Sequence, residues 1–191
     1  MPVLDHFNLI APFYDRLIKP VFPEKLVKLL EIPRGAVLVD VGGGTGRVAQ
    51  FFLDSARTVI VADISFGMLA QARDRHRLAA VCSASEVLPF ADNSIDRISL
   101  VDAFHHVIDQ RQTCRELWRV LKPGGRLVIE EPDIRSLAVI LIALAEKLAL
   151  MRSRFLSPAQ ISDCFAINGA QPRAQLDSHT AWIVVDKPSG Y

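Results

Sequence analysis

Short apolar runs recur along the chain and are separated by polar or amphipathic segments. β-Branched runs at 37–41 and 58–63 flank a stretch from Arg47 to Leu53 whose composition favours a helix. This order predicts a strand, a helix and a second strand, which together are the unit of a parallel sheet. Ser65 stands at an N-cap position before apolar residues spaced three and four apart, which predicts a second helix through Arg73.

The same alternation continues through residue 131. Runs at 78–82, 95–101 and 127–131 predict three further strands, and a helix is expected from Asp109 to Leu121. Lys122-Pro123-Gly124-Gly125 ends that helix with a proline and two glycines. Strands that alternate with helices predict a mostly parallel sheet covered on both faces.

The C-terminal part of the chain is less regular. The pattern predicts an apolar helix from Leu137 to Met151 and a shorter one behind Ser157-Pro158. Strand-like runs follow at Arg173 to Leu176 and at Ala181 to Val185. Because no repeat or linker marks a second domain, we predict a single doubly wound α/β domain.

Composition narrows the choice of partners. The 22 basic and 21 acidic residues give a formal net charge of +1, so no excess charge attracts nucleic acid or an anionic membrane. Cys82, Cys114 and Cys164 lie far apart, with no CxxC pair and no nearby histidine, so we expect reduced cytoplasmic thiols and no metal site. The N-terminus lacks the basic and apolar stretches of a targeting peptide, and the most apolar run, Leu137 to Ala145, is too short for the ~20 residues of a membrane span. A small neutral or apolar substrate fits best.

A glycine loop, Asp40-Val41-Gly42-Gly43-Gly44-Thr45-Gly46, follows the first predicted strand. Glycines between a buried strand and a helix allow positive φ values and let a ligand approach the backbone. Asp63 ends the next strand about 20 residues later, the spacing at which an acidic side chain reaches ribose hydroxyls. The loop and Asp63 together predict a nucleoside-bearing ligand.

The loop alone fits more than one interpretation. Gly44-Thr45-Gly46-Arg47-Val48-Ala49 also satisfies the G-x-G-x-x-A pattern of dinucleotide-binding enzymes. Glycines at a tight turn can also be purely structural. Against a nicotinamide enzyme, the predicted strand ends two residues before Gly44, and 191 residues leave little room for a separate substrate domain. The loop favours a methyltransferase without deciding the matter.

A series of motifs accompanies the glycine loop in a fixed order. They are Phe7-Asn8-Leu9-Ile10-Ala11-Pro12-Phe13-Tyr14-Asp15, the loop itself, Asp63-Ile64-Ser65 with Met68-Leu69, Leu88-Pro89-Phe90 with Ser94-Ile95-Asp96, His105-His106-Val107, and Glu116-Leu117-Trp118-Arg119-Val120-Leu121 followed by Lys122-Pro123-Gly124-Gly125. Through them the sequence resembles the class I S-adenosylmethionine-dependent methyltransferases over residues 7 to 132. The resemblance is greatest to the branch of type 11 methyltransferases that contains the ubiquinone and menaquinone biosynthesis C-methyltransferases.

This resemblance implies a fold and a cofactor. The fold is one Rossmann-like domain with a mostly parallel seven-stranded sheet and an antiparallel edge strand. Residues 1–30 would form lid helices, residues 36–132 the cofactor-binding core, and residues 133–191 the substrate-side helices and closing strands. The cofactor would be S-adenosylmethionine, with S-adenosylhomocysteine as the product. A non-catalytic cofactor-binding module or assembly partner remains an alternative, because the C-terminal region is short.

The resemblance also assigns residues to the two ends of the cofactor. Gly42, Gly43, Gly44 and Gly46 would lie against its methionine part, with Asp40 facing the ammonium group, although Asp40 could instead be a turn carboxylate. Asp63 would accept hydrogen bonds from the ribose, since a carboxylate suits a diol.

At the adenine end, Ile64 and Met68 would pack on the ring, although Met68 fits a helix core equally well. Members of the family commonly carry an acidic residue for the adenine amino group where this chain has Ala84. Without that acidic side chain, the adenine amino group would be recognised by Ser83, Ser85, Glu86 or the backbone near Val87.

Candidate catalytic residues follow the fourth predicted strand. The family contacts the cofactor near its reactive methyl at the position of Asp102, and His105 and His106 come next. Methyl transfer from a sulfonium depends mainly on alignment, and a base is needed only if the acceptor must lose a proton. The two histidines and Asp102 are the local candidates for such a base, and one histidine can be purely structural.

Two apolar segments would cover the bound ligands. Tyr14, next to Phe13, lies in the segment that folds over the cofactor as part of a lid in the relatives, although a helix docked on the core is also consistent with it. Leu137 to Met151 would provide an apolar wall for the acceptor, or a core helix or homodimer face. We therefore expect methyl transfer to carbon or oxygen of a small hydrophobic acceptor.

Overall fold

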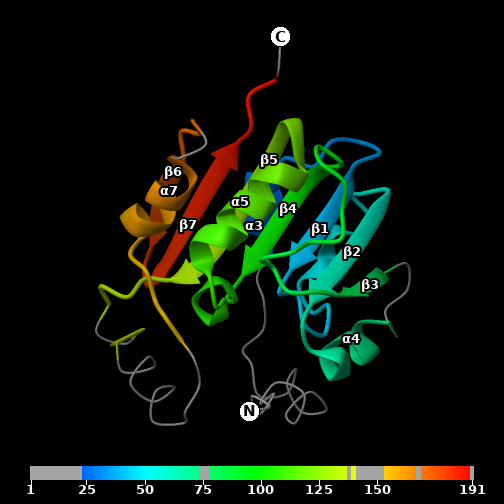
Figure 1. Ribbon diagram of the computed structural model, residues 1–191, viewed down its shortest axis with the longest axis horizontal. Coiled ribbons are helices and arrows are strands. Elements are labelled where there is room, and N and C mark those ends of the chain that lie inside the picture. Colours follow the sequence, from blue (N-terminus) through cyan, green and yellow to red (C-terminus); the bar gives the residue numbers. More distant parts are fainter. Residues whose placement is uncertain (1–22, 74–77, 137–138, 141–152, 167–168, 190–191) are drawn as a thin grey trace.

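A computed structural model describes residues 23–73, 78–136, 139–140, 153–166 and 169–189, which contain one seven-stranded sheet (Figure 1). The strand order is β3-β2-β1-β4-β5-β7-β6. The strands are β1 (Val37–Val41), β2 (Thr58–Asp63), β3 (Leu78–Cys82), β4 (Ile95–Val101), β5 (Leu121–Pro132), β6 (Arg173–Asp177) and β7 (Thr180–Asp186).

Strands β1 to β5 pair in parallel, whereas β7 is antiparallel to both β5 and β6. The predicted α/β class and mostly parallel sheet are thereby confirmed. The strand that opposes the others is β7. It lies just inside the edge, and the outermost strand β6 runs with β1 to β5.

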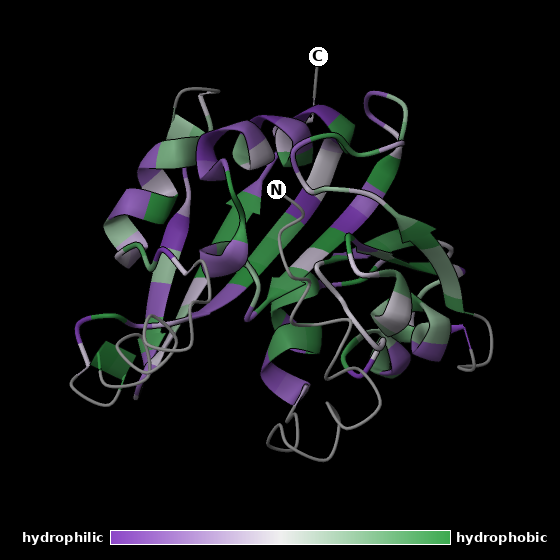
Figure 2. Ribbon diagram, turned by 60° about the horizontal axis from the view of Figure 1, so that its bottom comes forward, coloured by the Kyte–Doolittle hydropathy of each residue, from purple (hydrophilic) through white to green (hydrophobic). Residues whose placement is uncertain are grey.

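Helices cover both faces of the sheet. They are α3 (Glu24–Leu30), η2 (Ala49–Phe52), α4 (Phe66–Ala72), η3 (Phe104–His106), α5 (Gln110–Val120) and α7 (Pro158–Ala166). Successive strand residues point to opposite faces, so Leu38 packs with α3, η2 and α4, whereas Val39 packs with α5 and α7. Figure 2 shows hydrophobic stretches in the central strands and helices of mixed hydropathy.

Local capping explains where the helices begin. The Ser65 hydroxyl accepts from Met68 N at 3.5 Å, and the Asp109 carboxylate accepts from Gln112 N at 2.9 Å. Before α7, the Ser157 hydroxyl accepts from Gln160 N, while the Gln160 side chain accepts from Ser157 N. The helices expected after Ser65, Asp109 and Ser157 are confirmed.

Two elements differ from their predictions. The stretch from Arg47 to Leu53 is not an α-helix: the loop continues through turns and then forms only the short 3₁₀ helix η2. Strand β5 begins at Leu121 rather than at residue 127, because Leu121 already pairs with Ile95 of β4. Most of the predicted helix from Leu137 to Met151 lies outside the described residues.

The described part of the predicted lid is α3. Its buried Leu26 and Leu30 pack on the sheet, and the guanidinium of Arg97 donates to the carbonyls of Leu30 and Glu31. Within the described ranges, no helix has both the length and the hydropathy needed to cross a bilayer.

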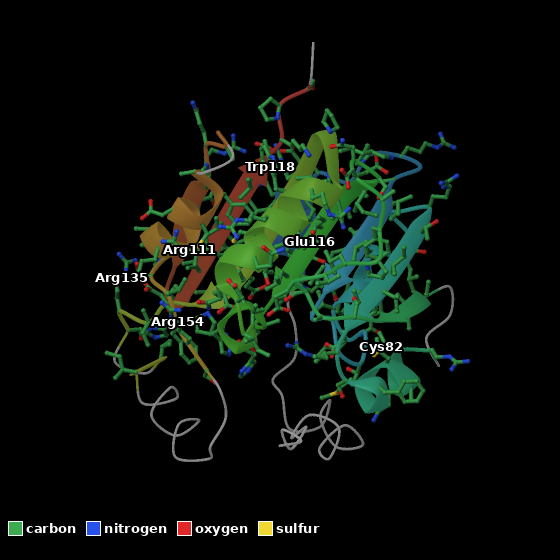
Figure 3. All side chains as sticks on the ribbon, in the orientation of Figure 1. Cys82, Arg111, Glu116, Trp118, Arg135 and Arg154 are labelled. Carbon is green, nitrogen blue, oxygen red and sulfur yellow. The ribbon has the colours of Figure 1, made fainter. Side chains whose placement is uncertain are left out.

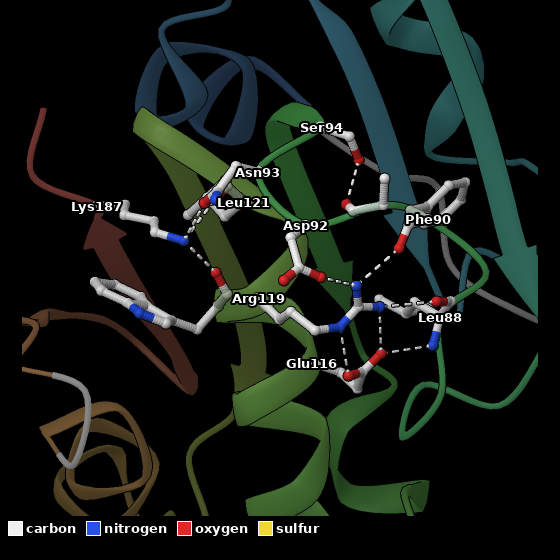
Figure 4. A network of polar contacts seen from close by, with 11 residues as sticks. Leu88, Phe90, Asp92, Asn93, Ser94, Glu116, Arg119, Leu121 and Lys187 are labelled. Atoms are coloured by element: carbon white, nitrogen blue, oxygen red, sulfur yellow. Dashed lines mark hydrogen bonds and ion pairs between the residues drawn. The ribbon is translucent and has the colours of Figure 1, made fainter. Parts of the chain in front are cut away.

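Arg119 joins α5 to the loop that follows β3 (Figure 4). Its guanidinium donates to both carboxylate oxygens of Glu116, each at 2.8 Å, and to the carbonyls of Leu88 and Phe90 at 3.0 and 2.9 Å. Glu116 in turn accepts from Leu88 N at 2.9 Å. The hydrogen bonds from Arg119 hold the pKa of Glu116 below its ordinary value.

We expect Arg119→Ala to lower the free energy of unfolding by about 2 to 3 kcal/mol at pH 7, because it removes the only described charged donor of the buried Glu116 carboxylate and the hydrogen bonds to two carbonyls. Since the pKa of Glu116 is lowered, this stabilisation is lost as the pH falls below the ordinary value of 4.5. Urea unfolding of both proteins measures the difference.

Arg115→Ala is the matched control. Arg115 is an exposed residue on the same helix, whose described hydrogen bond is to Gln112 at 3.3 Å. Its loss should change stability by less than about 0.5 kcal/mol. Equal losses in the two variants would contradict the role assigned to Arg119.

Candidate cofactor site

The glycine loop leaves β1 at the carboxyl edge of the sheet, where the strand order reverses between β1 and β4. Gly42, Gly44 and Gly46 have φ values of 69°, 54° and 76°, in the region that glycine adopts most readily. A Cβ on Gly42 would lie 2.6 Å from Cβ of Ala103, in the loop after β4. A side chain at Gly42 would therefore collide with the neighbouring loop.

Asp40 is buried beneath this loop with an exposed fraction of 1%. Its Oδ1 accepts from the Ser99 hydroxyl of β4 at 2.7 Å, whereas its Oδ2 has no hydrogen-bond partner among the described residues. A Cβ on Gly43 would lie 2.5 Å from that Oδ2. Burial raises the pKa of Asp40 to about 7, although the bond from Ser99 lowers it. The described hydrogen bond of the Asp40 carboxylate therefore comes from β4 and not from a backbone N–H of the turn.

Asp63 connects the glycine loop to the start of α4. Its Oδ2 accepts from Gly44 N at 2.9 Å, and its Oδ1 accepts from Ser65 N at 2.8 Å. Both carboxylate oxygens therefore accept from backbone N–H groups. The structure therefore brings the loop and the acidic end of β2 together.

The two apolar residues expected at the adenine end differ in exposure. Ile64 is 65% exposed, whereas Met68 is 2% exposed. The burial of Met68 agrees with the alternative interpretation of that residue as helix core. Ile64 lies at the surface beside Cys82, whose thiol donates to the Ile64 carbonyl at 3.6 Å.

Ser85 and Glu86 hold the loop after β3 against the start of α5. The hydroxyls of Ser85 and Thr113 lie 3.0 Å apart, and Oε1 of Glu86 accepts from Ile108 N and Asp109 N at 3.1 and 3.0 Å. Ser83 differs from both residues, since its buried hydroxyl has no partner within the described ranges.

The loop after β4 carries the three candidate catalytic residues. Asp102 has a φ of 53°, which is uncommon for a residue other than glycine, and its N donates to the Glu130 carbonyl at 2.9 Å. His105 is 2% exposed, whereas His106 is partly exposed. The two imidazole ring centres are 4.0 Å apart. The histidines therefore occupy different environments.

Two glutamates that the sequence analysis did not single out end β5 beside this loop. Oε2 of Glu131 lies 2.7 Å from Nδ1 of His105. Glu130 lies opposite Trp182 of β7, and burial together with the nearby charge of Asp102 raises its pKa to about 7. The signal in the sequence that could have identified them was two consecutive glutamates at the end of a predicted buried strand.

The carboxyl edge extends from Cys82 on β3 to Arg154, which precedes α7 (Figure 3). Tyr14 lies outside the described residues. In the part of the chain that the structure describes, no three histidine, cysteine, aspartate or glutamate side chains are grouped so that they could hold a metal ion.

Comparison with known proteins identifies the class. Residues 39–129 match the family described as "Methyltransferase domain". The chain is 35% identical over 134 residues to the demethylmenaquinone methyltransferase of Paenarthrobacter aurescens, covering 65% of this chain and 53% of that protein. It is 33% identical over 149 residues to the ubiquinone/menaquinone biosynthesis C-methyltransferase UbiE of Geobacter sulfurreducens, covering 68% and 57%. The chain thus spans little more than half the length of these relatives.

Among solved structures, the chain is similar to a SAM-dependent methyltransferase from Aquifex aeolicus, with a TM-score of 0.73, 18% identity, and coverage of 92% of this chain and 97% of that one. The fold is that of the class I S-adenosylmethionine-dependent methyltransferases. Residues 39–129 belong to the methyltransferase domain family, and the resemblance found in the sequence is confirmed.

The raised pKa of Asp40 predicts that the free energy of unfolding depends on pH. Because burial raises its pKa from 3.8 to about 7, the folded protein retains a proton that the unfolded chain releases. The stability due to this proton is present below pH 4 and lost as the pH rises through 7. Relative to Asp40→Asn, the ligand-free protein should lose up to about 4 kcal/mol of unfolding free energy between pH 4 and pH 8, measured by urea unfolding. Parallel pH profiles would contradict the raised pKa.

Proposed function

We propose that this chain transfers the methyl group of S-adenosylmethionine to carbon or oxygen of a small apolar acceptor. The observation that carries the proposal is the hydrogen bond from Gly44 N to Asp63, which joins the glycine loop to the acidic end of β2 where the strand order reverses. A backbone cradle beside a carboxylate suits a ligand that combines an amino acid with a ribose.

The residues around the loop fit this cofactor. The buried Oδ2 of Asp40, which has no partner among the described residues, lies against Gly43 and suits the ammonium group of a methionine moiety. Asp63 would accept from the ribose hydroxyls while it continues to hold the loop. Gly42, Gly44 and Gly46 would leave the backbone open to the ligand.

The adenine end would use an unusual set of residues. Exposed Ile64 would cover one face of the ring. With Ala84 in place of an acidic residue, the Ser83 hydroxyl is the side-chain group we favour for the adenine amino group, because Ser85 and Glu86 already bond to the start of α5. Met68 would support the site from the core.

When bound, the cofactor supplies an electrophilic methyl group on a sulfonium, and the chain supplies alignment. Asp102 would stand beside the reacting groups, where its positive φ turns the loop away from β4. His106, the more exposed of the two histidines, would face an acceptor that must lose a proton. His105 is buried and bound to Glu131, so it would act on the loop rather than on the acceptor.

An apolar acceptor is supported by the names of the relatives, which give demethylmenaquinone methylation and C-methylation in ubiquinone/menaquinone biosynthesis. A balanced charge is consistent with a small uncharged substrate. A cytoplasmic location, which the free cysteines suggest, belongs to the same proposal. The homodimer face considered for Leu137 to Met151 stays a prediction, because most of that segment lies outside the described residues.

Equilibrium binding tests the cofactor, and radiolabelled methyl transfer to a panel of naphthoquinols and benzoquinols tests the reaction. We expect binding of S-adenosylhomocysteine at micromolar concentration and none of NAD. The opposite preference would establish the dinucleotide alternative, which the G-x-G-x-x-A pattern left open. Tight binding of S-adenosylhomocysteine without transfer to any acceptor would favour a non-catalytic module.

Asp63→Ala should weaken S-adenosylhomocysteine binding by roughly 1 to 3 kcal/mol, since the ribose hydroxyls lose their acceptor and the loop loses its anchor. Isothermal titration calorimetry measures the change. Asp177→Ala is the control. Asp177 is exposed on β6, at the edge of the sheet far from β2, and it pairs with Lys25. Unchanged affinity in Asp63→Ala would refute the assignment.

A further inference from the structure

A carboxylate near the end of β5 binds the loop after β4. Oε1 of Glu131 accepts from Ala103 N at 2.9 Å and from Phe104 N at 2.7 Å, while Oε2 contacts Nδ1 of His105 at 2.7 Å. Glu131 is 3% exposed. A buried carboxylate is stable only when donors compensate its charge, so these three contacts hold Glu131 and the loop together.

The other sides of His105 are also occupied. The Phe155 ring stacks on the imidazole at 4.2 Å with an interplanar angle of 13°, and Arg154 N donates to the His105 carbonyl at 2.7 Å. The Gln110 amide bridges the Phe104 and Arg154 carbonyls at 3.0 and 2.8 Å. The loop is therefore held between the end of β5, the start of α5 and the segment before α7.

His106 has a different environment. Its ring touches that of His105, and its Nδ1 lies 3.3 Å from the Ser153 hydroxyl, but it is partly exposed. His106 thus lies against the ring of the buried His105 while part of its own surface is exposed.

We propose that Glu131 is a positioning residue that keeps the proton of His105 on Nδ1 and thereby orients the loop carrying Asp102 and His106 toward the reaction. An acceptor-only carboxylate requires Nδ1 to be the donor, which fixes the orientation of the ring. The effect of Glu131 on catalysis rests on the proposed methyl transfer. Its effect on the position of the His105 proton can be tested without that proposal.

Glu131→Gln separates the two roles of the carboxylate with little change of shape. The amide oxygen can continue to accept from Ala103 N and Phe104 N, which places the amide NH₂ against Nδ1 of His105. Because an NH₂ group only donates, Nδ1 must then accept, and the proton moves to Nε2. The variant should therefore reverse the tautomer of His105.

Nitrogen-15 NMR of the histidine rings at pH 8 in the ligand-free protein measures this change, with His105→Gln used to assign the signal. We expect a protonated Nδ1 in the wild type and an unprotonated Nδ1 in Glu131→Gln. Glu130→Gln is the control: it makes the same change one residue away on the opposite face of β5, and should leave the His105 signals unchanged. An unprotonated Nδ1 in the wild type would overturn the proposal even if the variant failed to fold.

The methyl-transfer assay completes the test. We expect kcat of Glu131→Gln to fall by about 100-fold, while the affinity for S-adenosylhomocysteine stays that of the wild type. A reversed tautomer with full kcat would overturn the catalytic part and leave a structural contact. Failure of the wild type to bind S-adenosylhomocysteine would instead refute the proposed function, and the tautomer would still decide whether Glu131 orients His105.

Discussion

Side-chain carboxylates that accept backbone N–H groups hold the loops at the functional edge of this sheet. Asp63 holds the glycine loop, Glu86 the start of α5, Glu116 the loop after β3, and Glu131 the loop after β4. Loop N–H groups lie beyond the strand ladders and need acceptors from elsewhere. Each of these carboxylates accepts from one or two such groups, and its charge strengthens each bond. The rest of the site depends on this arrangement.

This constraint explains why the motifs occur together in one order. The acidic end of β2 and the glycine loop are partners in a hydrogen bond, as are Leu88 and Glu116. Arg119 adds bonds from the same helix to the same loop. Motifs that look separate along the chain are thus the two halves of contacts across the sheet, and each half would lose its partner without the other.

Asp40 departs from the pattern, and the departure is informative. Asp40 is buried more deeply than the partly exposed Asp63 and Glu86, yet its described hydrogen bond comes from the Ser99 hydroxyl and one oxygen has no described partner. The loop carboxylates are neutralised by the protein's own donors, whereas Asp40 is held at the loop with a raised pKa. The distinction separates groups that build the site from a group suited to receive a charged ligand.

The sequence alone determined the features that depend on near neighbours. Strand alternation placed β1 to β4, and Ser65 and Asp109 marked helix starts, because a cap and its target lie three residues apart. Tertiary structure decided the start of β5, where Leu121 pairs with Ile95, and the difference between His105 and His106. It also supplied Glu131, whose partners lie 26 to 28 residues away along the chain. Periodicity reports which face a residue occupies, but contacts at that distance exist only after the strands have paired.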